Sequence, residues 1–114
     1  MKKVLEILGR LDRAGQETFV MNIFRYIDRK RFDLYFSVNT DYVGAYEAEI
    51  LSAGGKIFHN PYAVSLKNLR LYLRAFRKFL REEGPFDAVH CHVYSFGGFL
   101  LRAAYKEGVP VRIM

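Results

Sequence analysis

The 114-residue chain contains a single cysteine, Cys91, and no long run of apolar residues. One cysteine excludes an internal disulfide, which suits a reducing compartment. The apolar stretches fall well short of the roughly 18 residues that a membrane-spanning helix needs. The first residues, Met1 to Lys3, lead directly into a strand-like segment without a signal-peptide cleavage pattern. We therefore expect a cytoplasmic protein.

Two common phosphate-binding signatures are also missing. No G-x-x-x-x-G-K-S/T run occurs, which excludes a P-loop, and Gly9 and Gly15 are too far apart for a G-x-G-x-x-G dinucleotide fingerprint. The chain has no internal repeat, linker or low-complexity segment. A chain of this length is expected to form one domain with a core of its own.

Strand-like and helix-like segments alternate along the chain. Short, mostly apolar runs predict strands, and apolar residues at helical spacing predict helices between them. This alternation predicts an α/β fold, a Rossmann-like doubly wound parallel sheet of about five strands in the order 3-2-1-4-5 with helices on both faces. The predicted strands are 4–8, 32–38, 56–59, 86–92 and 109–114. The first predicted helix follows the turn after the first strand. The other three are 45–53, 66–83 with Ser65 as its N-cap, and a helix that ends at 106 and has Ser95 as its candidate cap.

Such sheets bind ligands at the carboxyl ends of their strands, where the strand order reverses. In the predicted order this point lies between the first and fourth strands. The turn from Gly9 to Glu17 and the segment 90–98 would then face each other across one crevice. Backbone N–H groups of the turn, at the start of a helix, favour anionic or strongly polar oxygens, although a plain connector has the same composition.

His90 and His92 fall on the same side of the fourth predicted strand, because side chains alternate, and Cys91 points away from them. Two imidazoles are fewer than the three or four ligands of a usual metal site, so we predict no metal. His90 is either a ligand-binding group or a hydrogen-bonded core histidine. His92, nearer the strand end, could donate to a sugar hydroxyl or a phosphate. Ser95 and Gly97 begin the next helix and offer a second group of amides, with a simple helix cap as the alternative.

The net charge of +6 favours an anionic partner. Much of the charge lies on one face of the 66–83 helix, which could contact anionic lipid headgroups by charge without inserting, or could simply be a solvated surface. This face lacks the interleaved aromatic residues that stack on bases, so nucleic acid is not the expected partner. The cationic residues are Lys67, Arg70, Arg74, Arg77, Lys78 and Arg81.

Three segments in order, LDRAGQETFVMNIFR, EAEILSAGGKIFHNP and FDAVHCHVYSFGGFLLRAAYKEGVPVRI, resemble the amino-terminal domain of bacterial family 4 glycosyltransferases. These are retaining enzymes of the GT-B fold, many of which make exopolysaccharides and capsules. The resemblance implies that residues 1–114 are the amino-terminal, acceptor-side half of a longer chain. The carboxyl-terminal domain, which would hold most of the nucleotide-sugar, would lie beyond Met114.

The resemblance also assigns roles to residues. Members carry Gly-Gly-x-Glu after the first strand, where this chain has Ala14, Gly15, Gln16 and Glu17. The amides of this loop would lie against the donor phosphates or the acceptor, and Glu17 would start the helix. The His-x-His strand end of the family matches His90 and His92, and its second histidine would contact the transferred sugar. No metal or other cofactor is expected, since amide dipoles and cationic side chains can stabilise the leaving diphosphate.

The resulting hypothesis is a glycosyltransferase domain that moves a sugar from a nucleotide-sugar donor to a saccharide or lipid-linked acceptor. The domain alone would be nearly inactive and could lie at the inner membrane face. A stand-alone flavodoxin-like module that binds a small anion is the alternative. The exposed fifth strand could also allow two copies of the domain to dimerise.

Overall fold

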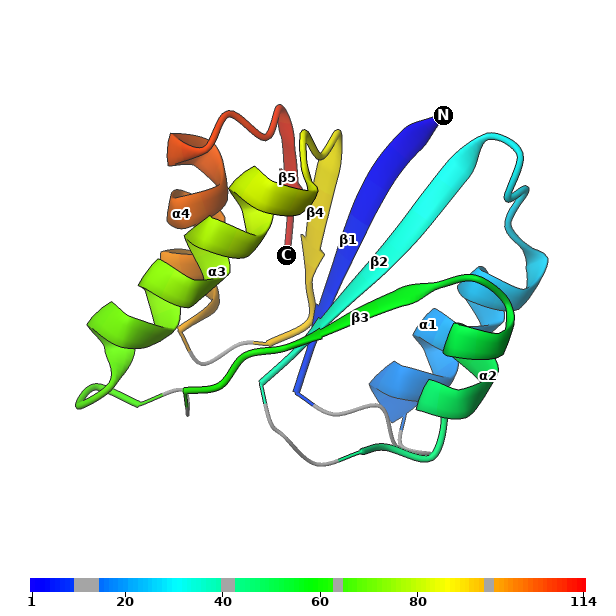
Figure 1. Cartoon of the computed structure of the whole chain (residues 1–114), viewed down its shortest axis with the longest axis horizontal. Coiled ribbons are helices and arrows are strands. Elements are labelled where there is room, and N and C mark those ends of the chain that lie inside the picture. The colour runs from blue at the N-terminus through cyan, green and yellow to red at the C-terminus, as the bar shows by residue number, and fades with distance from the viewer. Residues whose placement is uncertain (10–14, 40–42, 63–64, 94–95) are drawn as a thin grey trace.

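The computed structural model describes residues 1–9, 15–39, 43–62, 65–93 and 96–114. These residues form a five-stranded, all-parallel sheet in the order β3-β2-β1-β4-β5, which confirms the predicted α/β architecture. Helices cover both faces (Figure 1). In chain order the elements are β1 (Lys2–Leu8), α1 (Gly15–Tyr26), β2 (Phe32–Val38), α2 (Glu47–Ser52), β3 (Lys56–His59), α3 (Leu69–Glu83), β4 (Ala88–Cys91), α4 (Gly97–Lys106) and β5 (Val111–Ile113).

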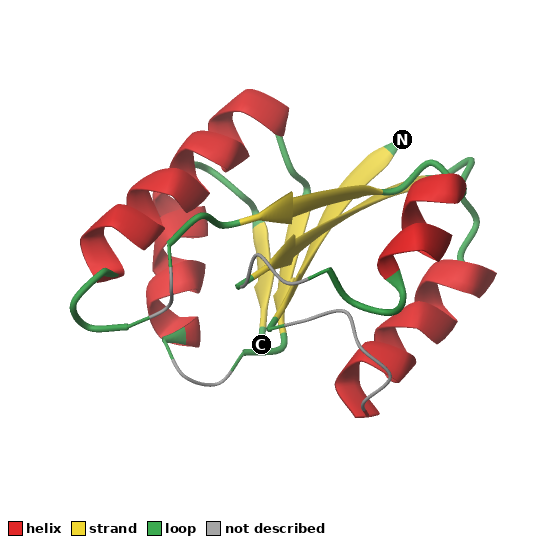
Figure 2. Cartoon of the chain, turned by 60° about the horizontal axis from the view of Figure 1, so that its bottom comes forward, coloured by secondary structure: helices red, strands yellow, loops and turns green. Residues whose placement is uncertain are grey.

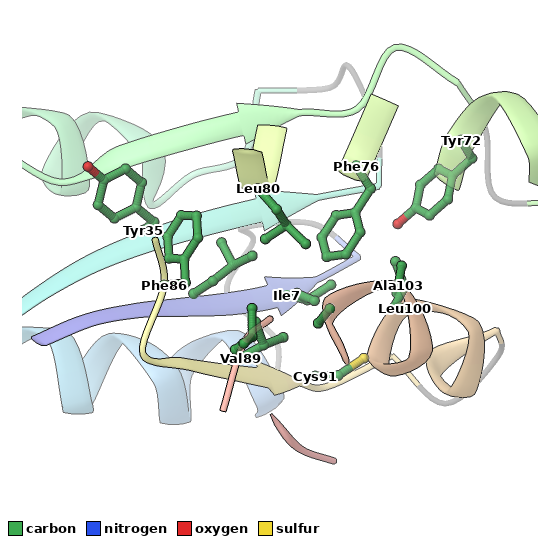
Figure 3. Packing of buried hydrophobic residues seen from close by; sticks show 13 residues of the cluster. Ile7, Tyr35, Tyr72, Phe76, Leu80, Phe86, Val89, Cys91, Leu100 and Ala103 are labelled. Atoms are coloured by element: carbon green, nitrogen blue, oxygen red, sulfur yellow. The ribbon is translucent and has the colours of Figure 1, made fainter. Parts of the chain in front are cut away.

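The helices pack in two pairs on opposite faces of the sheet, as Figure 2 shows. On one face, α3 and α4 pack against β1, β2 and β4 around buried aromatic and aliphatic side chains (Figure 3). Tyr35 and Phe86 make an edge-to-face contact with ring centroids 5.1 Å apart. Leu5 and Ile7 of β1 are fully buried at the centre of this cluster. The apolar stripe of α3 is thus used by the core of the domain itself.

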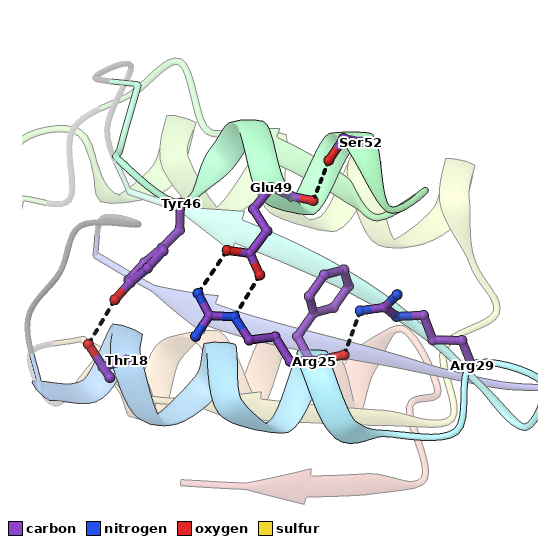
Figure 4. A network of polar contacts seen from close by, with 7 residues as sticks. Thr18, Arg25, Arg29, Tyr46, Glu49 and Ser52 are labelled. Atoms are coloured by element: carbon purple, nitrogen blue, oxygen red, sulfur yellow. Dashed lines mark hydrogen bonds and ion pairs between the residues drawn. The ribbon is translucent and has the colours of Figure 1, made fainter.

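On the opposite face, α1 and α2 pack over β1, β2 and β3. Val20, Met21 and Phe24 of α1 meet Phe36 of β2, and Ile50 of α2 completes the cluster. Polar contacts also join the two helices at their outer surface (Figure 4). Arg25 donates two hydrogen bonds to Glu49, at 2.6 and 2.8 Å, and the hydroxyls of Thr18 and Tyr46 lie 3.1 Å apart. The register of α2 on α1 is therefore held by both apolar and polar contacts.

The second helix pair leaves part of its face uncovered. In the register of the sheet, Glu6 pairs with His90 and His90 pairs with Ile113, so these three residues share one side. Among the described residues, the apolar cluster of α1 and α2 does not extend over β4 and β5. Ile113 is accordingly 49% exposed. The sheet surface beside His90 is open in the described part of the chain.

The beginning of α3 differs from the sequence prediction. We predicted a helix from Leu66 with Ser65 as its N-cap, but α3 begins at Leu69 and its N-cap is Asn68. Ser65 Oγ does accept a hydrogen bond from the backbone N–H of Asn68, at 3.2 Å, but this bond caps a separate turn. Leu66, predicted to begin the helix, is consequently outside it and 80% exposed.

Two other elements are shorter than predicted by one or two residues at each end: the helix predicted over 45–53 is α2, Glu47–Ser52, and the strand predicted over 109–114 is β5, Val111–Ile113. Gly54, after α2, has a φ of +86°, the left-handed conformation in which helices commonly end. The strand predicted over 86–92 is assigned only as Ala88–Cys91. Its hydrogen bonding to β1 nevertheless continues at both ends, from Asp87 N to Lys3 O at 2.8 Å and from His92 N to Ile7 O at 2.9 Å. Among the described residues, no helix has the length and apolar character needed to cross a bilayer.

Candidate functional site

The carboxyl ends of β1 and β4 lie side by side at the centre of the sheet (Figure 1). The chain leaves β1 toward α1 on one face and leaves β4 toward α4 on the other, so the crossover direction reverses between these two strands. This is the position at which parallel sheets commonly bind ligands, since no crossover segment fills the gap between diverging loops. The structure therefore brings the predicted switch point and the histidine pair together.

A buried carboxylate joins the two histidines at this position. Glu6 Oε2 lies 2.7 Å from His92 Nε2 and 3.2 Å from His90 Nδ1. The two imidazole centroids are 4.0 Å apart, and Glu6 is only 4% exposed. All three side chains are on one side of the sheet because Glu6 and His90 are paired in register and His92 follows two residues later. The three side chains form a compact unit, which we call the Glu6 cluster.

The shared oxygen determines which ring nitrogens are free. An ionised carboxylate only accepts hydrogen bonds, so His92 donates to Glu6 Oε2 from Nε2, while His90 Nδ1 lies 3.2 Å from the same oxygen. The proton on His92 Nε2 is assigned from this hydrogen bond. In a neutral ring, His92 Nδ1 is then left as an acceptor. The cluster can thus accept hydrogen bonds from hydroxyl groups, a property complementary to a saccharide.

The sequence analysis did not identify Glu6. It predicted that His90 and His92 share a side and that Cys91 points away, and the structure has this arrangement: Cys91 belongs to the cluster under α3 and α4. A signal for Glu6 was present, because a carboxylate in the middle of the apolar run VLEIL requires a polar partner once that strand is buried. The sequence does not specify that the partner of Glu6 comes from β4, because the pairing of β1 with β4 joins residues distant in the chain.

Not all of the predicted loop residues belong to the described structure. Ala14 and Ser95 lie outside the described residues. Gly15 and Gln16 open α1, and Glu17 lies in its first turn rather than at its start. That these residues face His92 across a crevice therefore stays a prediction.

Gly97 has a packing role in the fold. It is buried at the first residue of α4, and a side chain placed there would collide with the tip of Met114 and approach Cys91 Sγ to 3.5 Å. The preceding residue, Phe96, has a φ of +61°, a conformation that L side chains rarely adopt. A larger residue in place of Gly97 would therefore require the end of the Met114 side chain to move, whereas the distance to Cys91 Sγ of β4 is an ordinary van der Waals contact.

Further polar side chains line the same edge of the sheet at β2 and β3. The Tyr72 hydroxyl donates to Asn39 Oδ1, and Asn60 Nδ2 donates to the Tyr72 carbonyl at 3.1 Å. Burial raises the pKa of Tyr72 above its usual value. A second carboxylate–histidine pair lies nearby in the fold, with His59 Nε2 2.7 Å from Glu47 Oε1. No function was expected from the sequence for any of these five residues.

The predicted cationic face is partly neutralised. Arg77 and Arg81 of α3 both contact Glu107 beyond α4, at 2.8 and 2.6 Å. Lys78 lies 3.7 Å from Glu82, one turn along its own helix. In the part of the chain that the structure describes, Lys67, Arg70 and Arg74 have no ion-pair partner. The free positive charge is therefore concentrated at the amino-terminal end of α3.

Comparison with known proteins indicates the class of chemistry. The chain is 39% identical over 112 residues, 98% of its length, to a protein of Bacillus subtilis (strain 168) described as "Putative glycosyltransferase EpsF". The chain is related to this glycosyltransferase. It spans 29% of the length of this relative. No family model matches the chain. The relationship agrees with the glycosyltransferase resemblance in the sequence and with the Rossmann-like sheet.

Proposed function

We propose that this chain is the acceptor-side domain of a retaining GT-B glycosyltransferase, which transfers a sugar from a nucleotide-sugar to a saccharide or lipid-linked acceptor. The observation that carries this proposal is the 39% identity to a glycosyltransferase over 98% of the chain. The Glu6 cluster at the switch point supports it, because it offers ring nitrogens to sugar hydroxyls. A carboxyl-terminal domain, which this chain does not include, would supply most of the nucleotide-sugar site in the proposed enzyme.

Within this proposal each site residue has a physical role. His92 contacts the transferred sugar, and His90 lies beside it as a second acceptor. Glu6 orients the rings and accepts the hydrogen bond of His92. The amides of Gly15 and Gln16, which begin α1, together with that of Ala14, lie against donor phosphates or acceptor oxygens, where the helix dipole favours negative charge. Glu17 belongs to the first turn of α1, Gly97 adds an amide from the start of α4, and Ser95, outside the described residues, adds another. The transfer as proposed requires no metal ion.

Binding by the 114-residue chain tests the proposal directly. We expect oligosaccharides, or a panel of UDP- and GDP-linked sugars, to shift the backbone amide signals of 90–93 in an NMR titration. His92→Gln should weaken the binding about three- to tenfold, the worth of one hydrogen bond. His59→Gln is the matched control, because it removes a histidine from a carboxylate pair away from β4. Turnover should be negligible.

Three results would contradict this assignment. Robust sugar transfer by the 114-residue chain alone would show that no second domain is needed. Shifts produced equally by inorganic phosphate, with no response to any sugar, would favour the anion-binding, flavodoxin-like module instead. Responses confined to residues far from β1 and β4 would place the ligand elsewhere.

We also propose that the amino-terminal end of α3 contacts an anionic membrane that carries the acceptor. Lys67, Arg70 and Arg74 lie beside exposed Leu66 and Leu71, a combination suited to headgroups and the boundary of the acyl chains. The chain should co-sediment with vesicles containing anionic lipid and not with phosphatidylcholine alone. Binding that resists high salt, or that is equal on both vesicles, would contradict this contact.

Glu107 provides a variant that makes the membrane test sharper. Glu107→Gln frees Arg77 and Arg81 without removing a cation, so vesicle binding should increase. The exposed Val111 and Ile113 of β5 support the expectation that two copies of this chain can also associate through this surface. A clean monomer at high concentration in sedimentation would contradict that association.

A further inference from the structure

We infer that Glu6, His90 and His92 form a binding site for a divalent transition-metal ion of the Zn²⁺ class. This inference goes beyond the proposed function, which uses the same histidines without an ion. The sequence predicted no metal because it offered only two ligands, His90 and His92. The structure supplies a third ligand from the neighbouring strand.

Each of the three side chains offers one ligand atom, and these atoms lie close together. Glu6 Oε2, His90 Nδ1 and His92 Nε2 all lie within 4.8 Å of one another. Ligand atoms around a tetrahedral Zn²⁺ at about 2.0–2.1 Å from the metal are roughly 3.3 Å apart. The His90 contact of 3.2 Å already has this separation. The His92 contact, at 2.7 Å, must open by roughly half an ångström to reach it.

The type of ligands agrees with the geometry. Two imidazoles and one carboxylate are a ligand set that zinc uses in open sites, where three protein ligands leave the fourth position for water or substrate. Each ligand is held by regular structure: Glu6 and His90 lie in paired strands, and His92 N–H donates to the Ile7 carbonyl at 2.9 Å. Leu5, Ile7 and Val89 are fully buried behind them. The ligands are thus positioned before an ion arrives.

An ion can reach the site from the uncovered part of the sheet face. His90 is 28% exposed, and its neighbour in register, Ile113, is half-exposed. Glu6, in contrast, is almost completely buried. The ion would therefore sit between a buried anionic ligand and solvent, and its positive charge would be compensated by the buried carboxylate.

Other candidates in the described part of the chain lack this combination. The Glu47–His59 pair has the same 2.7 Å contact, but no third metal-ligating side chain is grouped with it among the described residues. Cys91 lies on the opposite side of β4, and its Sγ contacts the Val93 carbonyl at 3.4 Å. The Glu47–His59 pair and Cys91 therefore serve as internal controls for the metal test.

Metal binding would change the protonation of the His92 ring in a defined way. Without an ion, His92 Nε2 carries the proton donated to Glu6. A metal needs the lone pair of this same nitrogen, so in the neutral ring the proton moves to Nδ1. No proton is lost or gained overall from the neutral ring. The tautomer of His92 should therefore exchange when the ion binds.

The test uses the tag-free 114-residue chain, titrated with Co²⁺ while its visible absorption is recorded and then with competing Zn²⁺. We expect one equivalent to bind, with the intense bands of four-coordinate Co²⁺ that Zn²⁺ removes. Glu6→Gln and His92→Gln should each weaken binding at least about tenfold, since even changes to groups that only orient metal ligands cost about 10- to 100-fold. His59→Gln and Cys91→Ser should leave it unchanged. In ¹⁵N NMR, Zn²⁺ should exchange the tautomer of His92.

The outcomes separate this inference from the proposed function. No binding, binding unaffected by Glu6→Gln and His92→Gln, or binding lost in Cys91→Ser would overturn the metal site. Thermal unfolding curves show whether each variant is folded. If Glu6→Gln does not fold, His90→Gln replaces it as a variant of a metal ligand. Saccharide binding is measured in the presence of a chelator, so its failure would contradict the proposed function and leave the metal site standing.

Discussion

Glu6 Oε2 lies 2.7 Å from His92 Nε2, although the two residues are 86 positions apart in the chain. The contact crosses from β1 to the end of β4. These two strands are adjacent in the sheet, although α1, β2, α2, β3 and α3 lie between them in the sequence. The same carboxylate oxygen also contacts His90. Properties of the histidines at the centre of the molecule are therefore set by a residue near the amino terminus.

The first prediction concerns the tautomer of His92 in the metal-free chain. His92 should carry its proton on Nε2, because this nitrogen donates to Glu6 Oε2 at 2.7 Å. Ring ¹⁵N chemical shifts distinguish the two forms. In Glu6→Leu, which removes the acceptor, His92 should lose its preference for the Nε2 proton. Finding His92 protonated only on Nδ1 in the unmodified chain would contradict this hydrogen bond.

A second prediction compares two glutamates of α2. Glu47 is buried and accepts hydrogen bonds from the Gly44 N–H and from His59, so Glu47→Ala should lower the free energy of unfolding by about 1–3 kcal/mol. Glu49 pairs with Arg25 at the surface, and this hydrogen bond lowers the pKa of Glu49. Glu49→Ala should have little effect, since exposed ion pairs contribute little. Urea denaturation measures both, and equal losses would contradict the distinction.

The third prediction is a loss of stability at high pH that depends on Tyr72. Burial raises the pKa of Tyr72 in the folded protein, so above about pH 10 the unfolded chain releases its phenolic proton while the folded chain retains it. Stability contributed by the neutral phenol is complete below this pH and is lost as the pH rises further. Tyr72→Phe should lower stability at pH 7 by about 1 kcal/mol, because Asn39 loses its donor.

Denaturation at pH 8 and at pH 10.5 tests this pH dependence. The decrease between the two should be smaller in Tyr72→Phe than in the unmodified chain. Tyr105→Phe is the control, since Tyr105 is 65% exposed and its substitution should leave the decrease unchanged. Identical pH profiles for all three proteins would show that the Tyr72 phenol is accessible to solvent.

A fourth prediction concerns Ser37 in β2. Its side chain is fully buried, and its hydroxyl has no hydrogen-bond partner among the described residues. A buried unpaired polar group is costly, so Ser37→Ala should leave stability unchanged or raise it by up to about 1 kcal/mol. Ser52→Ala, at an exposed hydroxyl that donates to the Glu49 carbonyl, is the comparison. A clear destabilisation by Ser37→Ala in thermal unfolding would reveal a partner for this hydroxyl.

The sequence by itself determined the order of the strands and the common side of the two histidines. Alternating strand and helix patterns with short connections leave few parallel topologies, and right-handed crossovers leave fewer. The alternation of side chains along a strand is a local property, so His90 and His92 had to share a side while Cys91 pointed away. The glycine after α2 is an equally local signal, because a helix commonly ends at a residue in the left-handed conformation, which glycine adopts readily.

Only the tertiary structure decided which distant groups meet. Glu6 reaches His90 and His92 because the packing of α3 and α4 sets the register of β1 against β4, and no local pattern encodes that register. The pairing of Glu107 with Arg77 and Arg81 likewise depends on how α4 lies beside α3, and it reduces a cationic face that looked continuous on a helical wheel. Short-range periodicity specifies the elements, whereas charges and hydrogen-bonding groups find their partners through contacts between elements.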